Sequence, residues 1–216
     1  GLGDVYKRQF FNDPVDMKEW REKWAVLLAL SNKILCFSNS SKELLLSAYH
    51  DLDEKKIEII PHQVDPLQTV IVDQKTDKQD IVIGVLGAIN HAKGGGVLKE
   101  LVRTIEQRNL NIKVVLIGEI SENIKSDHFY VTGRYQREEL PKLVAKYEID
   151  IFLLPSICPE TFSYTTQEIM MMDMPLMVFD LGAPAERVVN YRKGHVIVEV
   201  STEAILKAIK NLSKNC

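Results

Sequence analysis

Residues 81–86 read Ile-Val-Ile-Gly-Val-Leu, an almost unbroken apolar run that predicts a strand buried on both faces of a sheet. The turn that follows, residues 87–96, reads Gly-Ala-Ile-Asn-His-Ala-Lys-Gly-Gly-Gly. Beyond it, residues 97–105 carry apolar side chains at helical spacing. A buried strand, a glycine-rich turn and an amphipathic helix are the start of a βαβ unit, which predicts a parallel sheet with helices on its faces.

The same alternation of strand and helix continues to the end of the chain. Further strands are expected over residues 114–117, 129–131, 151–154, 176–179 and 196–198, and further helices over residues 140–147 and 164–172 and from residue 202. This pattern predicts a doubly wound, Rossmann-like α/β domain over residues 81–216. Because ligands of such sheets bind at the carboxyl ends of the strands, function is expected in the loops after Leu86, Gly118, Val131, Leu154 and Phe179.

The first part of the chain predicts a smaller βαβ unit. A helix is expected from Asp13-Pro14 to Asn32, followed by a strand over residues 34–37. A capping box at residues 40–43 predicts a helix through Tyr49, and residues 57–60 predict a second strand. Residues 63–80 are polar and interrupted by proline, which indicates a linker. The expected division is therefore a partial second Rossmann-like lobe over 1–62, a linker over 63–80, and the main domain over 81–216.

Composition excludes several classes of protein. The 216 residues include 27 Lys+Arg and 30 Asp+Glu, a net charge of −3, and the basic residues are dispersed, so nucleic acid is not an expected partner. The longest apolar run, Trp24–Leu30, is far shorter than the roughly 20 residues of a membrane helix. Three isolated cysteines, Cys36, Cys158 and Cys216, indicate neither disulfides nor a zinc site. A cytoplasmic protein is expected, with peripheral contact at the inner face of the membrane left open.

Lys93 and the three glycines after it stand where a helix should begin. A cation opposes the dipole of a helix N-terminus, so this arrangement favours an anion held between backbone N–H groups and the lysine. The alternative is a solvated lysine on a flexible turn. Neither of the common phosphate-loop patterns is present, so the loop alone leaves the two open.

The loop and helix start at residues 155–168 read Pro-Ser-Ile-Cys-Pro-Glu-Thr-Phe-Ser-Tyr-Thr-Thr-Gln-Glu. Small and hydroxyl-bearing residues before a helix leave N–H groups free to hold a diphosphate. Glu168, one turn further on, could accept the hydroxyls of an attached ribose. The alternative is structural: residues 165–168 form a capping box, and Glu160 is then a surface residue.

Two other features favour structural explanations. Asp51-Leu52-Asp53 imitates a metal-binding D-x-D motif, but it lies in a charged turn after a helix and is interpreted as solvated. The methionines at positions 170–172, 174 and 177 are expected to fill the core. No metal and no cofactor are predicted.

Residues 155–168, Lys93-Gly94 and Val131-Thr132-Gly133, together with the E-x7-E spacing of Glu160 and Glu168, resemble the donor-binding half of a GT-B glycosyltransferase of group 1 (family 4). The segment Phe179–Arg187 matches the same family. The resemblance covers residues 81–209 as a complete C-terminal domain and residues 15–61 as the last part of an N-terminal domain.

The resemblance implies roles for individual residues. Glu168 would hold the ribose, Lys93 would neutralise the diphosphate, and Glu160 would contact the transferred sugar. The other residues that the resemblance places at the donor are Gly87, Phe162, Ser163, Tyr164, Thr165, Arg134 and Tyr135. Of these, the backbone amides at residues 163–165 would hold the diphosphate, and the loop at Gly133-Arg134-Tyr135 would line the nucleobase. Ala88 stands where the family usually has an arginine, so neutralisation would depend on Lys93.

The function implied is metal-independent transfer of a hexose, with retention, from a nucleotide-diphosphate sugar to a glycan or lipid-linked acceptor. A role in bacterial surface polysaccharide synthesis is expected. The alternatives are a sugar-nucleotide epimerase or phosphorylase of the same architecture, and a non-catalytic nucleotide-binding module. The acceptor site is expected on the N-terminal lobe, of which only the last part is present, so this chain is expected to bind donor but transfer little sugar.

Overall fold

The computed structural model describes residues 16–70 and 80–212. The chain divides into two compact units, Gly1–Ile60 and Pro61–Cys216. The sequence-based division into a partial lobe, a linker and a donor domain stays a prediction, and residues 71–79 of its linker lie outside the described residues. No helix in the described part of the chain has the length and apolarity needed to cross a bilayer.

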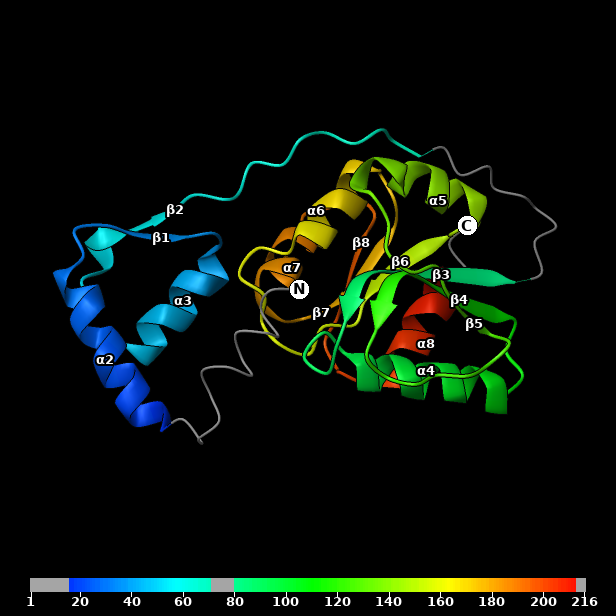
Figure 1. The fold of residues 1–216 in the computed structure, drawn as a ribbon, viewed down its shortest axis with the longest axis horizontal. Helices are drawn as coiled ribbons and strands as arrows, with labels where there is room; N and C mark the ends of the chain where they lie inside the picture. Colours follow the sequence, from blue (N-terminus) through cyan, green and yellow to red (C-terminus); the bar gives the residue numbers. More distant parts are fainter. Residues whose placement is uncertain (1–15, 71–79, 213–216) are drawn as a thin grey trace. The chain divides into compact units, whose positions relative to one another are not determined.

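The first unit is a single βαβ arrangement. It consists of α2 (Met17–Leu30), β1 (Ile34–Cys36), α3 (Asn39–Ala48), the 3-10 turn η1 (Glu54–Lys56) and β2 (Ile57–Ile59) (Figure 1). Strands β1 and β2 pair in parallel, with Ile34 opposite Ile57, as the sequence predicts.

Hydroxyl and carboxylate caps set the helix starts in this unit. The side chain of Asp16 accepts a hydrogen bond from the N–H of Lys18 (2.8 Å) and begins α2, while the predicted start at Asp13-Pro14 lies outside the described residues. Ser38 accepts from the N–H of Ser41 (3.1 Å), so α3 begins at Asn39. The predicted capping box at residues 40–43 is therefore wrong, because the buried Ser38 hydroxyl takes the cap position two residues earlier.

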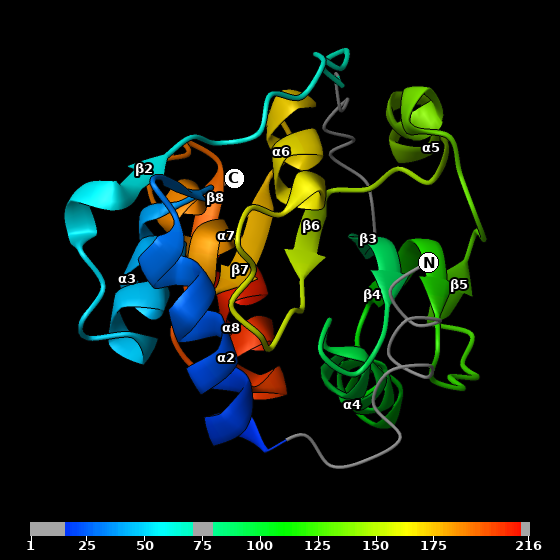
Figure 2. The same cartoon turned by 60° about the vertical axis from the view of Figure 1, so that its left-hand side comes forward.

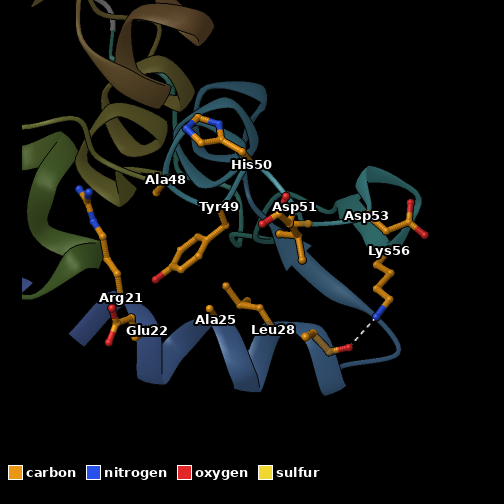
Figure 3. Close-up of a pocket in the computed structure, with 12 residues that line it drawn as sticks. Arg21, Glu22, Ala25, Leu28, Ala48, Tyr49, His50, Asp51, Asp53 and Lys56 are labelled. Atoms are coloured by element: carbon orange, nitrogen blue, oxygen red, sulfur yellow. Dashed lines mark hydrogen bonds between the residues drawn. The ribbon is translucent and has the colours of Figure 1, made fainter. Parts of the chain in front are cut away.

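A pocket of about 520 Å³ lies in this unit beside α2 and the turn after α3 (Figure 3). The Nζ atom of Lys56 donates to the carbonyl of Ala29 (2.8 Å), which joins the turn to the end of α2. Asp53 accepts from the N–H of Lys55 (3.0 Å) and caps η1. One carboxylate of the D-x-D sequence thus has a structural role in a turn.

The second unit is built on six parallel strands in the order β5-β4-β3-β6-β7-β8. The strands are β3 (Ile81–Ile89), β4 (Ile112–Ile120), β5 (Phe129–Val131), β6 (Ile151–Leu154), β7 (Leu176–Phe179) and β8 (Gly194–Ile197). The chain builds outward from β3 to one edge and then from β6 to the other, so the direction of winding reverses between β3 and β6. The fold class predicted from the sequence is confirmed, and the reversal marks the place where such sheets bind ligands.

Helices cover both faces of this sheet. On one face lie α4 (Gly95–Gln107) and α8 (Thr202–Leu212). On the other lie α5 (Leu140–Lys146), which follows the 3-10 turn η2 (Arg137–Glu139), α6 (Tyr164–Met171) and α7 (Gly182–Val188), and Figure 2 separates α4 from α6 clearly. Met172, Met174 and Met177 are buried, as expected for core methionines, whereas Met170 and Met171 are only half-buried. Helix α7 was not predicted, because Gly182 and Pro184 within seven residues interrupt any helical pattern.

Candidate functional site

Two loops meet at the reversal point, one between β3 and α4 and the other between β6 and α6. The N–H of Ile157 donates to the carbonyl of Ala92 (3.1 Å), which ties the loops together. Gly94 has φ +81°, and a Cβ atom there would lie 1.8 Å from the carbonyl oxygen of Pro155. Only glycine fits this contact, since a side chain would meet both backbone strain and a fixed carbonyl.

A second close glycine contact joins β4 to β3. Gly118, at the end of β4, has φ +143°, and a Cβ atom there would lie 2.0 Å from the carbonyl oxygen of Gly87. On its other side, a Cβ atom on Gly87 would lie 3.3 Å from the Cγ2 atom of Thr165. Main chain and small groups therefore line the carboxyl ends of β3 and β4.

Lys93 and Glu160 form an ion pair across the two loops. Asn90 accepts the N–H of Lys93 on its side-chain oxygen (3.0 Å), which fixes the turn. The Nζ atom of Lys93 lies 2.7 Å from Oε1 of Glu160, whose side chain is only 9% exposed. The angle of approach does not satisfy a hydrogen bond, so Oε1 is buried with a charge partner and without a directed donor among the described residues. Glu160 is thus not a surface residue, and Lys93 is not a free solvated lysine.

The start of α4 is already close to a carboxylate of the protein itself. A Cβ atom on Gly95 would come within 2.4 Å of both carboxylate oxygens of Glu122, and the hydroxyl of Ser121 donates to Glu122 (2.9 Å). Glu122 thus places a carboxylate of the protein beside this helix N-terminus, and the anion site predicted there stays a prediction. Lys93 turns instead to the loop before α6.

The start of α6 is shaped by Ser163. This residue has φ 66° and ψ 94°, a conformation that non-glycine residues rarely adopt, and its hydroxyl accepts from the N–H (3.4 Å) and the hydroxyl (2.9 Å) of Thr166. The predicted capping box at residues 165–168 is wrong, because Ser163 takes the cap position and Glu168 binds elsewhere. In the described part of the chain, no hydrogen bond engages the N–H groups of Ser163, Tyr164 or Thr165.

Arg187, on α7, fixes the orientation of these free N–H groups. It donates to the carbonyls of Phe162 (3.0 Å) and Ser163 (3.4 Å), and its guanidinium lies 4.6 Å from the centre of the Phe162 ring. In a trans peptide the carbonyl of one residue and the N–H of the next point in opposite directions. Arg187 therefore turns the N–H groups of Ser163 and Tyr164 away from itself, and burial lowers the pKa of its guanidinium.

Glu168 is buried on α6, with 8% of its surface exposed. Its Oε1 atom accepts from Nε of Arg137 (3.1 Å). Burial raises the pKa of Glu168 above its ordinary value, while the charge and hydrogen bond of Arg137 oppose that rise. Burial, reinforced by the charge of Glu168, also raises the pKa of Tyr135 to about 12. Glu168 and Tyr135, both predicted at the donor, therefore lie near one another.

A pocket of about 460 Å³ gathers most of the predicted residues. It is lined by His62, Lys93 and residues 159–165, which include Glu160, Phe162, Ser163, Tyr164 and Thr165. Gly87 lies beside the pocket, against Thr165, and neither Glu168 nor Tyr135 is among the residues that line it. Arg134 does not join this group, because its side chain is 86% exposed and pairs with Glu119 (3.0 Å).

Three residues of this region were given no donor role by the sequence. His62 stacks on Tyr164 with ring centres 5.3 Å apart, and it meets the edge of Phe162 with ring centres 5.0 Å apart. Arg137, on η2, donates to Glu168 on α6, and Arg187, on α7, donates to the carbonyl of Phe162 in the loop before α6. In the sequence Arg137 is an isolated arginine and Arg187 only ends the segment 179–187, because the residues that they bind are distant along the chain.

Larger pockets exist, but they lack this combination of features. The 520 Å³ pocket lies in the first unit, and another of about 640 Å³ lies beside α8. The 460 Å³ pocket lies at the reversal point and combines a helix start with free N–H groups, a buried carboxylate and a lysine. The fold and the site together define a doubly wound α/β protein with a pocket at the reversal point between β3 and β6, where sheets of this kind bind ligands.

Comparison with solved structures supports the fold. Sucrose-phosphate synthase from Thermosynechococcus elongatus matches with a TM-score of 0.72 and 15% identity, over 99% of this chain and 57% of that one. Anabaena Alr3699/HepE, in complex with UDP-glucose, matches with a TM-score of 0.69 and 16% identity, over 90% of this chain and 58% of that one. A glycosyltransferase from Rickettsia africae matches with a TM-score of 0.66 and 19% identity, over 93% of this chain and 57% of that one. The chain thus spans little more than half the length of these structures.

The family follows from the sequence match. Residues 67–215 match the model of the glycosyl transferases group 1. The chain belongs to this family of GT-B glycosyltransferases, as its resemblance suggested. No curated protein matches the chain.

Proposed function

We propose that residues 61–212 bind a nucleoside-diphosphate sugar, and that the whole protein transfers its hexose, with retention and without a metal, to a glycan or lipid-linked acceptor. The observation that carries the proposal is the pocket in which free N–H groups at the start of α6 face the same space as the Lys93–Glu160 pair. Anabaena Alr3699/HepE, which has this fold, was solved with UDP-glucose, and this supports a sugar nucleotide as the ligand class.

The proposal places the diphosphate at the start of α6. There the N–H groups of Ser163, Tyr164 and Thr165 would donate to its oxygens, and the helix dipole would add partial positive charge. Lys93 is close enough to Glu160 to share its ammonium group between the carboxylate and a phosphate oxygen. Ala88 leaves the loop without the usual arginine, so Lys93 would be the main cation at the diphosphate.

The chemical step is a displacement at the anomeric carbon. A bond forms from the acceptor hydroxyl oxygen to that carbon, the bond to the diphosphate oxygen breaks, and the acceptor proton passes to the departing diphosphate on the same face. Lys93 and the α6 N–H groups would stabilise the charge that develops on the leaving group. Glu160 would orient the sugar.

The acceptor and the transfer step are proposed for the whole protein. For residues 1–216 alone we expect nucleotide binding with little transfer. A cytoplasmic location, at the inner membrane face during surface polysaccharide synthesis, is part of the same proposal.

Calorimetry tests the donor site. We expect the parent chain to bind one of UDP, GDP or dTDP, Lys93→Ala to weaken that diphosphate about tenfold or more, and the matching nucleoside to bind both chains alike. Glu168→Ala should weaken diphosphate and nucleoside together. Lys99→Ala, an exposed lysine on α4, serves as the matched control and should change neither.

A folded parent chain that binds none of the three diphosphates would overturn the proposal. So would diphosphate affinities equal to the parent in both Lys93→Ala and Glu168→Ala. Turnover of a sugar nucleotide without any acceptor, with epimerised sugar or sugar phosphate as product, would favour the epimerase or phosphorylase alternative.

A further inference from the structure

Arg137 lies at a junction of three segments. From η2, its Nε atom donates to Oε1 of Glu168 on α6 (3.1 Å), and its Nη2 atom donates to the backbone carbonyl of Asp65. Nη2 also lies 3.8 Å from the sulfur of Met171. One guanidinium thus connects the buried glutamate, the helix that carries it and the segment at the start of the second unit.

The contact leaves Glu168 able to bind a ligand. Within the described residues only Oε1 accepts a hydrogen bond, and the second oxygen, Oε2, accepts none. A carboxylate oxygen has two lone pairs, so Oε2 could accept both hydroxyls of a ribose. Because Nε of Arg137 has a fixed direction within the planar guanidinium, the hydrogen bond on Oε1 also fixes the rotation of the carboxylate.

Residues 61–70 run past α6 (Figure 2). They contact the second unit through His62, Asp65 and Val70. His62 stacks on Tyr164 at the start of α6, and the N–H of Val70 donates to the carbonyl of Met172 at its end (3.0 Å). Asp65 lies between these two points along the chain and is held by Arg137. The segment therefore contacts α6 directly near its start and end, and Arg137 connects the middle of the segment to Glu168 on the same helix.

We propose that Arg137 is a positioning residue that holds the carboxylate of Glu168 for the ribose of the donor and ties it to residues 61–70 through Asp65. This inference rests on the proposed function for the identity of the ligand, and it deepens that proposal by adding a residue that the family resemblance did not supply. Its core, the control of Glu168 by Arg137, can be measured without any ligand.

The titratable groups that face Glu168 are Arg137 and Tyr135. Tyr135, with its raised pKa, stays neutral over the accessible pH range, so Arg137 is the group that favours the ionised carboxylate. Without Arg137, burial alone would act, and the pKa of Glu168 would rise further. A carboxyl with a raised pKa in the folded protein favours folding below its unfolded pKa, and that stability is lost as pH rises through the folded pKa.

The ligand-free test compares urea unfolding of the parent, Arg137→Met and Arg137→Met/Glu168→Gln at pH 5 and pH 8. We expect Arg137→Met to lose more stability at pH 8 than at pH 5, because only the ionised glutamate suffers from the missing cation. The double variant should lose this pH dependence. An equal loss at both pH values would show Arg137 to be a structural contact only and would overturn the proposal.

The ligand test measures affinity for the nucleoside diphosphate across the same pH range. In Arg137→Met we expect affinity to fall about tenfold or more between pH 8 and pH 5, and to fall further than in the parent, because loss of the cation raises the pKa of Glu168. Arg137→Lys keeps the charge and should restore part of the affinity, while Arg103→Met, an exposed arginine on α4, should match the parent. Equal affinity of Arg137→Met and parent at every pH would overturn the positioning role.

Hydrogen exchange tests the attachment of residues 61–70. Bound nucleotide should slow amide exchange over residues 63–69 in the parent but not in Arg137→Met. Identical slowing in both chains would overturn the link through Asp65. A parent that binds no nucleotide, combined with the expected pH-dependent stability of Arg137→Met, would overturn the proposed function and the ribose role, yet support the control of Glu168 by Arg137.

Discussion

The ammonium group of Lys93 lies 2.7 Å from the buried Oε1 atom of Glu160, and this pair joins the two loops that meet at the reversal point of the sheet. Each member depends on the other for its charge balance. Glu160 would be a buried, uncompensated anion without the lysine, and such a group destabilises a fold more than a paired one stabilises it.

Removing Lys93 alone should therefore destabilise the protein. We expect Lys93→Met to lower the free energy of unfolding by about 1–3 kcal/mol, because it leaves the buried carboxylate without a partner. The double variant Lys93→Met/Glu160→Gln should recover part of that loss. Urea denaturation of the parent, the single variants and the double variant measures the coupling. Additive losses would show that the pair does not interact across the loops.

Arg187 should matter for both stability and diphosphate binding. Arg187→Met removes the donors of two carbonyls and the contact with the Phe162 ring, so we expect a loss of about 2–3 kcal/mol in the free energy of unfolding. Diphosphate affinity should fall as well, because the N–H groups at residues 163 and 164 lose their fixed direction. Arg187→Lys should be intermediate, since lysine cannot reproduce the planar fork.

Thermal unfolding and calorimetry on the Arg187 variants check this expectation, with Arg103→Met on α4 as the exposed control. If Arg187→Met bound diphosphate as tightly as the parent while losing stability, the arginine would only support the loop.

Two glycines at the start of α4 should respond oppositely to alanine. Gly94→Ala introduces a Cβ atom against the Pro155 carbonyl at a positive φ, so we expect a loss of about 3 kcal/mol or more in the free energy of unfolding. Gly96, two residues later, faces open space, and Gly96→Ala should gain about 0.5 kcal/mol through reduced freedom of the unfolded chain. Urea denaturation of both variants measures the two changes in the free energy of unfolding. Changes of the same sign and size would contradict the close packing at Gly94.

Acid should weaken the contact at Asp173. The hydrogen bond from Lys193 (2.7 Å) is the largest cause that lowers the pKa of Asp173 below its ordinary value. A carboxyl with a lowered pKa adds stability above its unfolded pKa of about 3.9, and that stability is lost as pH falls through the folded pKa. Asp173→Asn keeps a residue suited to the left-handed φ of 56°.

We expect the stability difference between parent and Asp173→Asn to be constant from pH 7 to pH 5 and to shrink below about pH 4. Unfolding curves across that range measure it. A difference that grows in acid would contradict the direction of the pKa shift.

The fold was largely predictable because its signals are local. Strands β5, β6 and β7 match the predicted bounds, since short, continuous apolar runs between polar turns leave little choice of register. Helix α7 was missed, because its start is set by a distant contact in which the N–H of Ala183 donates to the carbonyl of Glu160 (2.9 Å). A seven-residue helix with glycine and proline carries no such signal in its own sequence.

The site was predictable in its members but not in its connections. The loops around Lys93 and Glu160 could be named because carboxyl ends of parallel strands are where ligands bind. Two ion pairs could not be predicted, that of Glu160 with Lys93 and that of Glu168 with Arg137. They depend on how separate segments of the chain lie in three dimensions. The residue pairs that fix both carboxylates are thus properties of the folded chain.

Gly94 packs on Pro155 and Gly118 packs on Gly87 beside the pocket, and neither main-chain contact admits an added side chain. Attempts to redirect donor choice by directed evolution should therefore leave these glycines unchanged. Variation belongs instead at exposed positions such as Arg134, where a side chain can change shape and charge without separating the two loops.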